Sequence, residues 1–267
     1  MKTGRVGLFA GAVAMTAAVF ASPAPAATLI GDYQLQGTLA SSGTGPALTK
    51  VGSGTSQFQN DNVMGSSRQV LAFPLASGVQ ISPAGVGTGS YSVVTTFRFD
   101  DVSSYERILD TTDGTSDSGI YVSGSADPGY GYPFFSSSPP PYQVTGENTR
   151  AFANNVYATT TMVVTPPSLT SIYVNGALEL TATHGVTPLS DTLRLFKDDS
   201  TEESPGAVSC IRLYSGGLSS AEAAGIGASP TCGTVTSPIK KKKCKKHKKK
   251  HRAADAKKKK CKKRKKH

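Results

Sequence analysis

The sequence predicts an all-β protein, an antiparallel two-sheet sandwich with one short helix. In residues 91–100 apolar side chains alternate with polar ones, a period of two that is typical of half-buried antiparallel strands. The apolar positions of this alternation are Tyr91, Val93, Phe97 and Phe99. The 28 Gly and 16 Pro indicate many short strands joined by turns rather than long helices. Asn175-Gly176 lies between two extended runs and predicts a hairpin, because both turn residues must accept positive φ.

Short apolar runs predict roughly ten to twelve strands in all. They fall at residues 28–30, 33–35, 70–73, 78–81, 91–99, 107–109, 119–122, 157–165, 169–174, 177–183, 193–196 and 206–214. Residues 91–99 and 107–109 are expected to be neighbours in one sheet. Residues 123–143 are rich in Gly, Ser and Pro and are expected to form a loop, because three prolines at 139–141 cannot donate to a ladder. A capping box at Ser219 and Glu222 predicts one short helix at residues 221–226.

The N-terminal residues have the pattern of a secretory leader. Lys2 and Arg5 precede an Ala/Gly/Val-rich run at 6–21, and Ala24-Pro25-Ala26 offers the small-x-small pattern of a cleavage site. We therefore expect residues 1–26 to be a signal peptide, residues 27–232 to form the folded domain and residues 233–267 to form a tail. An uncleaved anchor is the alternative, disfavoured because the run is short and holds few Leu or Ile. The protein is expected to be secreted or at the cell surface, with no transmembrane segment in the mature chain.

Charge divides the chain into an acidic body and a basic tail. Residues 28–239 hold 8 basic and 17 acidic side chains, a net of −9, whereas residues 240–267 hold 19 Lys and Arg against one Asp, a net of +18. The tail has almost no apolar residues to bury and is predicted to be disordered. Its lysine runs are candidate polyanion-binding residues: Lys240, Lys241, Lys242, Lys243, Lys257, Lys258, Lys259 and Lys260.

Secretion argues against specific nucleic acid as the partner of the tail and favours an anionic cell-envelope polymer. Teichoic acid, lipopolysaccharide and acidic polysaccharide all fit, and nothing in the sequence selects among them. Zinc is a weaker alternative, on the spacing of Cys244, His247, His251 and Cys261, because the metal would have to organise a self-repelling segment without a core.

Several motifs resemble the bacterial laminin-G-like family. They are residues 97–101 (FRFDD), 107–110 (RILD), 172–176 (IYVNG), 206–214 and 218–222. The resemblance covers about residues 32–227 and implies the jelly roll of the concanavalin A-like lectin/glucanase superfamily. It says little about the ligand. The sequence departs from the family in having no Trp, a common sugar-stacking residue, and in the Pro/Tyr-rich stretch at 123–143.

Catalysis is not expected. Glycosidases of the related superfamily carry closely spaced acids on one strand, because acid and nucleophile must flank one glycosidic bond. Glu106 and Asp110 are the nearest candidates and share a face if their strand is regular. The family's Glu-x-Asp-x-x-Glu pattern is absent, and surface ion pairing with nearby charges explains both acids.

Two further sets of residues are candidate binding sites. Some laminin-G-like domains bind calcium at a rim, and Asp198, Asp199 and Glu202 offer the hard oxygen ligands that calcium takes; no other cofactor is expected. In the 123–143 stretch the candidate ligand contacts are Tyr130, Tyr132 and Tyr142, whose amphipathic rings suit sugar faces or a protein partner. The equally weighted alternative is that Phe134 and Phe135 enter the sandwich and the tyrosines cover them. His184 is expected to be inert.

Cys210 and Cys232 are expected to form a disulfide. Cys210 has neighbours, Val208 and Ile211, that look more core-like, so its thiol is expected to face away from the core, and Cys232 follows the helix within reach. In an exported protein this pairing is the natural interpretation, with two free thiols as the alternative. It closes a loop of about 23 residues and contributes roughly 3 kcal/mol in the chain-entropy model.

These observations predict a secreted, non-catalytic binding or adhesion module for a glycan or protein ligand. Its polycationic tail is expected to contact anionic cell-envelope polymers. One alternative is a structural surface protein in which only the tail binds. The least favoured is a polysaccharide glycosidase.

Overall fold

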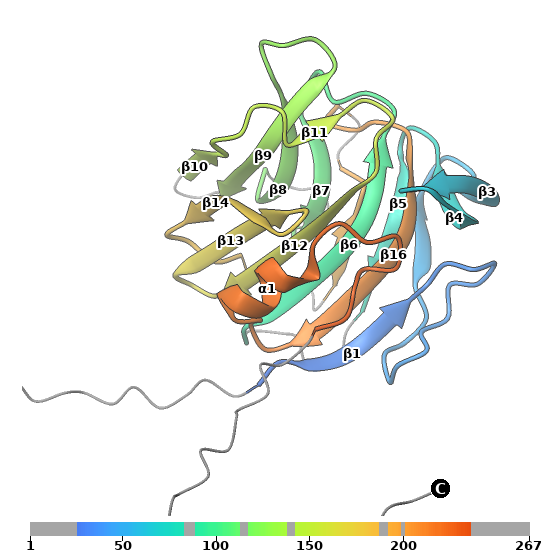
Figure 1. Cartoon of the computed structure of the whole chain (residues 1–267), viewed down its shortest axis with the longest axis horizontal. Helices are drawn as coiled ribbons and strands as arrows, with labels where there is room; N and C mark the ends of the chain where they lie inside the picture. The colour runs from blue at the N-terminus through green and yellow to red at the C-terminus, as the bar shows by residue number, and fades with distance from the viewer. Residues whose placement is uncertain are drawn as a thin grey trace, which may run out of the picture. The chain divides into compact units, whose positions relative to one another are not determined.

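Two antiparallel sheets stack face to face around one core (Figure 1). The computed structural model describes residues 26–82, 89–112, 117–137, 142–186, 192–198 and 201–235. The predicted leader and the lysine runs of the tail therefore lie outside the described residues. The only helix found in the described ranges is seven residues long, and no helix there is long and apolar enough to cross a membrane.

Sheet A has eight strands within the described residues. In spatial order they are β14 (Ala177–Ala182), β13 (Leu169–Val174), β12 (Ala158–Thr165), β6 (Tyr91–Phe99), β16 (Gly206–Ser215), β4 (Ser66–Phe73) and β3 (Gln57–Val63), with β1 (Thr28–Tyr33) also paired to β16. Sheet B likewise has eight. They are β10 (Tyr142–Thr145), β9 (Tyr130–Ser137), β8 (Gly119–Gly124), β7 (Glu106–Asp110), β15 (Leu193–Leu195), β5 (Ser77–Ile81) and β2 (Thr49–Gly52), with β11 (Phe152–Ala153) paired to β9. The predicted all-β sandwich is confirmed.

The alternation in β6 works as predicted. Tyr91, Val93, Phe97 and Phe99 are at most 2% exposed and belong to the core between the sheets. Most of the opposite parity is buried as well, because the segment after the helix covers it: the Thr96 hydroxyl donates to the Ser229 carbonyl at 2.7 Å. Arg98 at the end of the strand stays partly exposed on this face.

The expectation that residues 91–99 and 107–109 are neighbours in one sheet is wrong. β6 lies in sheet A between β12 and β16, whereas β7 lies in sheet B between β8 and β15. The short connection that follows Phe99 crosses from one sheet to the other, and both strands contribute apolar residues to the shared core from opposite sides. Alternation fixes which face is apolar but does not say which sheet a strand joins.

The expected loop at 123–143 is also largely wrong. β9 occupies residues 130–137 and pairs with β8, β10 and β11, although Pro133 sits in its middle opposite Val122. Phe135 is fully buried in the core, so packing against neighbouring strands overrides the low strand propensity of Gly and Pro. The three prolines at 139–141 lie outside the described residues.

A polar hairpin, β3–β4, was missed apart from its end at residues 70–73. Its turn is Met64-Gly65, with φ of 51° and 83°. β3 reads QFQNDNV, which has few β-branched residues and so gives little signal of a strand. This hairpin forms one side of the groove described below.

The predicted local motifs are confirmed. Asn175 and Gly176 have φ of 51° and 88° between β13 and β14. Helix α1 (Ser220–Ile226) begins after the capping box made by Ser219 and Glu222. It packs over sheet A in a second apolar cluster that includes residues of β6, β12, β13 and β16, as Figure 1 shows. The Cys210–Cys232 disulfide belongs to this cluster and ties β16 to the segment that follows α1.

Candidate functional site

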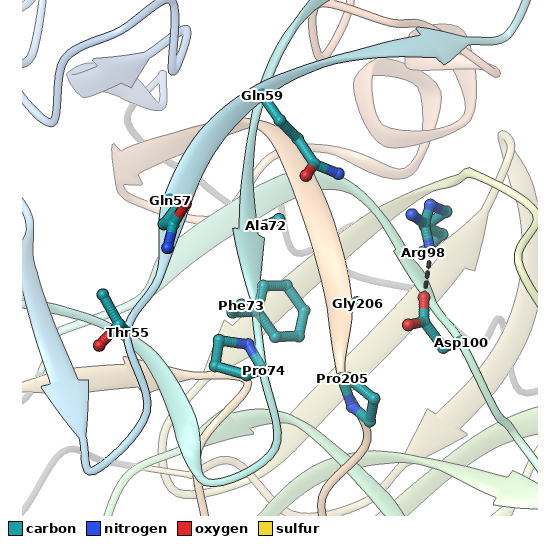
Figure 2. Close-up of a pocket in the computed structure, with 10 residues that line it drawn as sticks. All are labelled: Thr55, Gln57, Gln59, Ala72, Phe73, Pro74, Arg98, Asp100, Pro205 and Gly206. Atoms are coloured by element: carbon teal, nitrogen blue, oxygen red, sulfur yellow. Dashed lines mark hydrogen bonds and ion pairs between the residues drawn. The ribbon is translucent and has the colours of Figure 1, made fainter.

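A groove on the outward face of sheet A is the main candidate site. It lies between the β3–β4 hairpin and β6, with β16 passing beneath (Figure 2). One row of paired residues crosses it: Gln57 opposite Ala72, Ala72 opposite Ala207, and Ala207 opposite Arg98. On β4, β16 and β6 the chain neighbours of the row, such as Leu71, Val208 and Phe97, belong to the core. Side chains alternate along a strand, so the row itself faces outward. We call this hollow the β3 groove.

The β3 groove is hollow because small residues lie between its two walls. Ala72 and Gly206 line it between the longer side chains of Gln57 and Arg98, and its volume is about 320 Å³. At one end of the groove lies Gly206. A Cβ added there would lie 2.2 Å from the carbonyl oxygen of Arg98, so the position has no room for a side chain. This volume is within the range of small-molecule sites, about 300–1,000 Å³.

An ion-paired network forms the β6 wall of the groove. Arg98 contacts Asp61 at 3.3 Å and also pairs with Asp100, the pair drawn in Figure 2. The hydroxyl of Tyr157 donates to Asp61 at 2.8 Å. Burial alone would raise the pKa of Asp61, but this hydrogen bond, the amide of Asn62 and the charge of Arg98 together hold it below its ordinary value. The guanidinium is therefore neutralised within the wall.

The β3 wall carries two amides with unused hydrogen-bonding capacity. Gln57 and Gln59 are exposed and extend over the groove in Figure 2. Within the described part of the chain neither side chain has a hydrogen-bond partner. Pro74 and Pro205 close one end of the groove and add apolar surface. The groove can thus accept and donate hydrogen bonds to a polar, uncharged ligand.

The structure separates the three tyrosines proposed from the sequence. Tyr132 pairs with Ser123, in the outward-facing set of sheet B, and Tyr130 lies two residues before it with Arg150 stacked at 4.8 Å. Tyr142 pairs with Ser137, on the opposite parity, and packs against the core.

The contacts of Tyr142 are internal. Its hydroxyl shares a hydrogen bond of 2.9 Å with Thr183, and its ring lies 3.8 Å from the ring of His184. The alternative was that Phe134 and Phe135 both enter the sandwich. Phe135 does enter the core, whereas Phe134 faces outward and packs against Tyr121.

The acidic loop proposed for calcium is tied to an arginine. Asp198 is 4% exposed and accepts from Arg107 at 2.6 Å, so one of its oxygens is already used. Glu202 lies at the edge of a small pocket on sheet B, and Asp199 lies outside the described residues. Among the residues that the structure describes, no group of three or more His, Cys, Asp or Glu is arranged to hold a metal ion.

Glu106 and Asp110 do not face one site. A bulge between Arg107 and Leu109 breaks the register of β7, so Glu106 pairs with inward-facing Val122 while Asp110 pairs with Gly119 on the outward side. The expectation that both are surface acids is wrong: they are 4% and 0% exposed. Acids on opposite faces of a strand cannot flank one glycosidic bond.

Burial changes the protonation of Glu106. Its Oε2 has no hydrogen-bond partner among the described residues. Burial first, and then the charges of Asp101, Glu202 and Glu203, raise its pKa to about 8. At neutral pH this carboxyl is mainly protonated.

Glu106→Gln is expected to remove part of the pH dependence of stability. An unfolded Glu titrates near 4.3, so between about pH 4.3 and 8 the folded chain holds a proton that the unfolded chain has released. The free energy of unfolding then falls as the pH rises, by up to about 1.4 kcal/mol per unit from one group. Gln stays neutral, so the variant should match the parent at or below about pH 4 and exceed it by a margin that grows as the pH rises to 9.

Urea unfolding of both proteins at pH 4, 7 and 9 checks this. Glu147→Gln, at an exposed carboxyl, is the matched control and should leave the pH profile of the parent unchanged. Parallel profiles for parent and Glu106→Gln would show that Glu106 is ionised in the folded state at neutral pH.

A family model for the concanavalin A-like lectin/glucanases superfamily matches residues 75–224, more than half of the chain, and confirms the resemblance inferred from the sequence. No curated protein matches the chain. Many solved structures do.

One similar structure is domain 4 of AbnA, an extracellular GH43 arabinanase from Geobacillus stearothermophilus, solved with arabinotriose. Its TM-score is 0.57 at 15% identity, covering 75% of this chain and 98% of that domain. The binding domain of Paraclostridial mosquitocidal protein 1 gives 0.54 at 9% identity, covering 74% and 51%. Botulinum neurotoxin type C, whose cell entry depends on two ganglioside molecules, gives 0.51 at 14% identity, covering 72% and 49%. This chain spans about half the length of the two toxin chains, and at these identities the likeness shows the fold alone.

Proposed function

This chain belongs to the concanavalin A-like lectin/glucanase superfamily, and on that premise we propose that it is a secreted, non-catalytic module that binds a neutral oligosaccharide in the β3 groove. Two amides that have no hydrogen-bond partner among the described residues carry the proposal. Gln57 and Gln59 each offer a carbonyl acceptor and two N–H donors at the side of a hollow of about 320 Å³. Sugar hydroxyls both donate and accept, so they match this wall better than an anion or an apolar ligand does.

The charges and shape of the groove support the same ligand class. Arg98 is already paired with Asp61 and Asp100, so the groove offers no free cation to attract an anionic ligand. Pro74 and Pro205 supply apolar surface for the C–H face of a sugar ring. The arabinotriose in the similar arabinanase domain makes arabinotriose a reasonable first probe.

Sheet B provides a further proposed contact surface. Tyr130 and Tyr132 stand at alternate positions of β9, half-buried and outward, where their rings suit the face of a sugar. The absence of catalysis is proposed because the nearest acid pair, Glu106 and Asp110, faces opposite sides of its strand.

The lysine runs of the tail are the second part of the proposal. We propose that residues 240–267, with a net charge of +18, hold the module against anionic cell-envelope polymers. Most basic side chains of residues 28–239 are already paired with carboxylates, so they contribute little to binding an anionic polymer, and this supports assigning that role to the tail. Examples are Arg150 with Asp127 and Arg212 with Asp32.

The β3 groove is tested by the double variant Gln57→Ala/Gln59→Ala in the full chain. Each hydrogen bond is worth about 0.5–1.5 kcal/mol, so losing two should weaken oligosaccharide binding by about tenfold. The parent is screened on an array of neutral oligosaccharides that includes arabinotriose, and hits are measured by calorimetry.

Asn60→Ala is the matched control, because Asn60 is an exposed amide on the same strand with the opposite parity. It should bind as the parent does. Equal affinity of the parent and the double variant for every hit would remove the groove from the function, and an array without hits would reject neutral oligosaccharides as ligands.

A further inference from the structure

A second pocket lies on the outward face of sheet B, the sheet opposite to the one that carries the β3 groove. Its volume is about 110 Å³, and it is lined by Tyr105, Asp117, Tyr121, Phe134, Gln143 and Glu202. We call it the Tyr121 pocket. Sites for whole small molecules measure about 300–1,000 Å³, so this one is sized for a single functional group.

Three aromatic rings form one side of the pocket. The centroids of Tyr105 and Phe134 are 5.1 Å apart, and those of Tyr121 and Phe134 are 5.9 Å apart. Arg107 lies 4.0 Å from the Tyr121 centroid and holds the ring in place from below. The charge of Arg107 is directed to Asp198, 2.6 Å away, in an ion pair whose two side chains are at most 2% exposed.

The acids of the pocket, Asp117 and Glu202, form no ion pair with any described residue. Burial first, and then a hydrogen bond to Asp198 and the charges of Asp198 and Asp117, raise the pKa of Glu202 to about 7, although the charge of Arg107 acts in the opposite direction. Negative charge is therefore crowded here and would be relieved by a cation.

An unsatisfied hydroxyl points to a missing partner. Tyr121 is 1% exposed, and its hydroxyl has no hydrogen-bond partner in the described structure. Besides Arg107 and Asp198, whose charges act on this phenol more strongly, the charges of Glu202 and Asp117 reach it, so the hydroxyl lies near both acids of the pocket. A buried hydroxyl without a partner is costly, so a donor that enters the pocket gains an acceptor already in position.

We propose that the Tyr121 pocket binds the primary ammonium group of an amino sugar. An ammonium has three donors, which match the carboxylates of Asp117 and Glu202 and the oxygen of Tyr121. The rings of Tyr105 and Phe134 add cation–π attraction, and the Gln143 amide is available to a neighbouring hydroxyl. An N-acetylated sugar is bulkier and uncharged at this position and fits poorly. The inference rests on the proposed glycan-binding function and adds a second, separate site.

The test compares the trisaccharide of glucosamine with that of N-acetylglucosamine on the full chain, by calorimetry at pH 7 and about 0.15 M salt. The amino trisaccharide is expected to bind at least about tenfold more tightly. Glu202→Gln and Tyr121→Phe should each weaken it several-fold and leave arabinotriose binding unchanged. Glu147→Gln removes the same charge from an exposed site and should bind both sugars as the parent does.

Equal affinity for the two trisaccharides, or full affinity in Glu202→Gln, would overturn the inference. Nα-acetyl-lysine amide that competes as well as glucosamine would overturn the sugar specificity, since any alkylammonium would then suffice. The two sites fail separately: binding of neutral sugars that is sensitive to Gln57→Ala/Gln59→Ala, with no preference for the amine, rejects only the Tyr121 pocket. Amine binding without any neutral sugar binding rejects the β3 groove.

Discussion

Arg107→Met is expected to destabilise the fold by about 3–5 kcal/mol, a large share of the 5–15 kcal/mol that is typical of a domain. The side chains of Arg107 and Asp198 are 0% and 2% exposed and meet at 2.6 Å. Arg107 also donates to the Ser118 carbonyl at 3.1 Å and stacks on Tyr121. Removing the guanidinium leaves a buried carboxylate without its cation, and the loss of that partner accounts for most of the effect.

Urea unfolding followed by circular dichroism of the full chain measures this change. Arg107→Met/Asp198→Asn removes both charges and should recover much of the loss, because the two effects are coupled. Arg107→Lys keeps the charge without the fork of donors and should lie between the parent and Arg107→Met. If Arg107→Met does not accumulate, the double variant and Asp198→Asn still complete the comparison. A midpoint of Arg107→Met within error of the parent would contradict this role of the ion pair.

The features that could be predicted from the sequence are local ones. The hairpin at Asn175-Gly176 and the capping box at Ser219 each depend on residues within a few positions of one another. The Cys210–Cys232 disulfide could be inferred because its partners flank one short helix. Alternation in β6 gave its core face directly. Such signals need no knowledge of which strands pair.

The errors come from pairing between distant segments. A crossing from β6 to β7 reads in the sequence like a turn between neighbours, because the connection is short in either case. β9 forms despite its Gly and Pro because β8 and β10 flank it and Phe135 enters the core. Tertiary contacts supply free energy that strand propensity does not include.

The candidate site depends entirely on such pairing. The β3 groove exists because Gln57, Ala72, Ala207 and Arg98 fall in one row across four strands. No spacing in the sequence reveals that row. The alternation of Gln57 and Gln59 around Phe58 is the one available signal, and it identifies a strand rather than a site.

Neither proposed sugar site offers a free positive charge that could attract an anionic surface. The β3 groove contains an arginine that its own carboxylates neutralise, and the two acids of the Tyr121 pocket form no ion pair with a residue that the structure describes. Residues 28–239 have a net charge of −9 and are expected to be repelled by anionic surfaces. We therefore propose that attachment to such a surface comes from the tail.

Replacing eight tail lysines by Gln is expected to abolish most binding to anionic vesicles. The substituted residues are Lys240, Lys241, Lys242, Lys243, Lys257, Lys258, Lys259 and Lys260. Their replacement lowers the net charge of residues 240–267 from +18 to +10. Each Lys or Arg close to an anionic membrane contributes about 1 kcal/mol, so the change removes several kcal/mol, more than about a hundredfold in affinity. The measurement is co-sedimentation with phosphatidylglycerol vesicles, and neutral phosphatidylcholine vesicles are the control.

Salt provides the second arm of this experiment. The Debye length shrinks from about 10 Å at 0.1 M to about 3 Å at 1 M, so binding of the unsubstituted chain should be lost at 1 M salt. Deleting residues 240–267 should also abolish binding at 0.1 M, because the remaining body is acidic. Retention of the truncated chain at low salt would assign adhesion to the sandwich, and undiminished binding of the full chain at 1 M salt would refute the electrostatic mechanism.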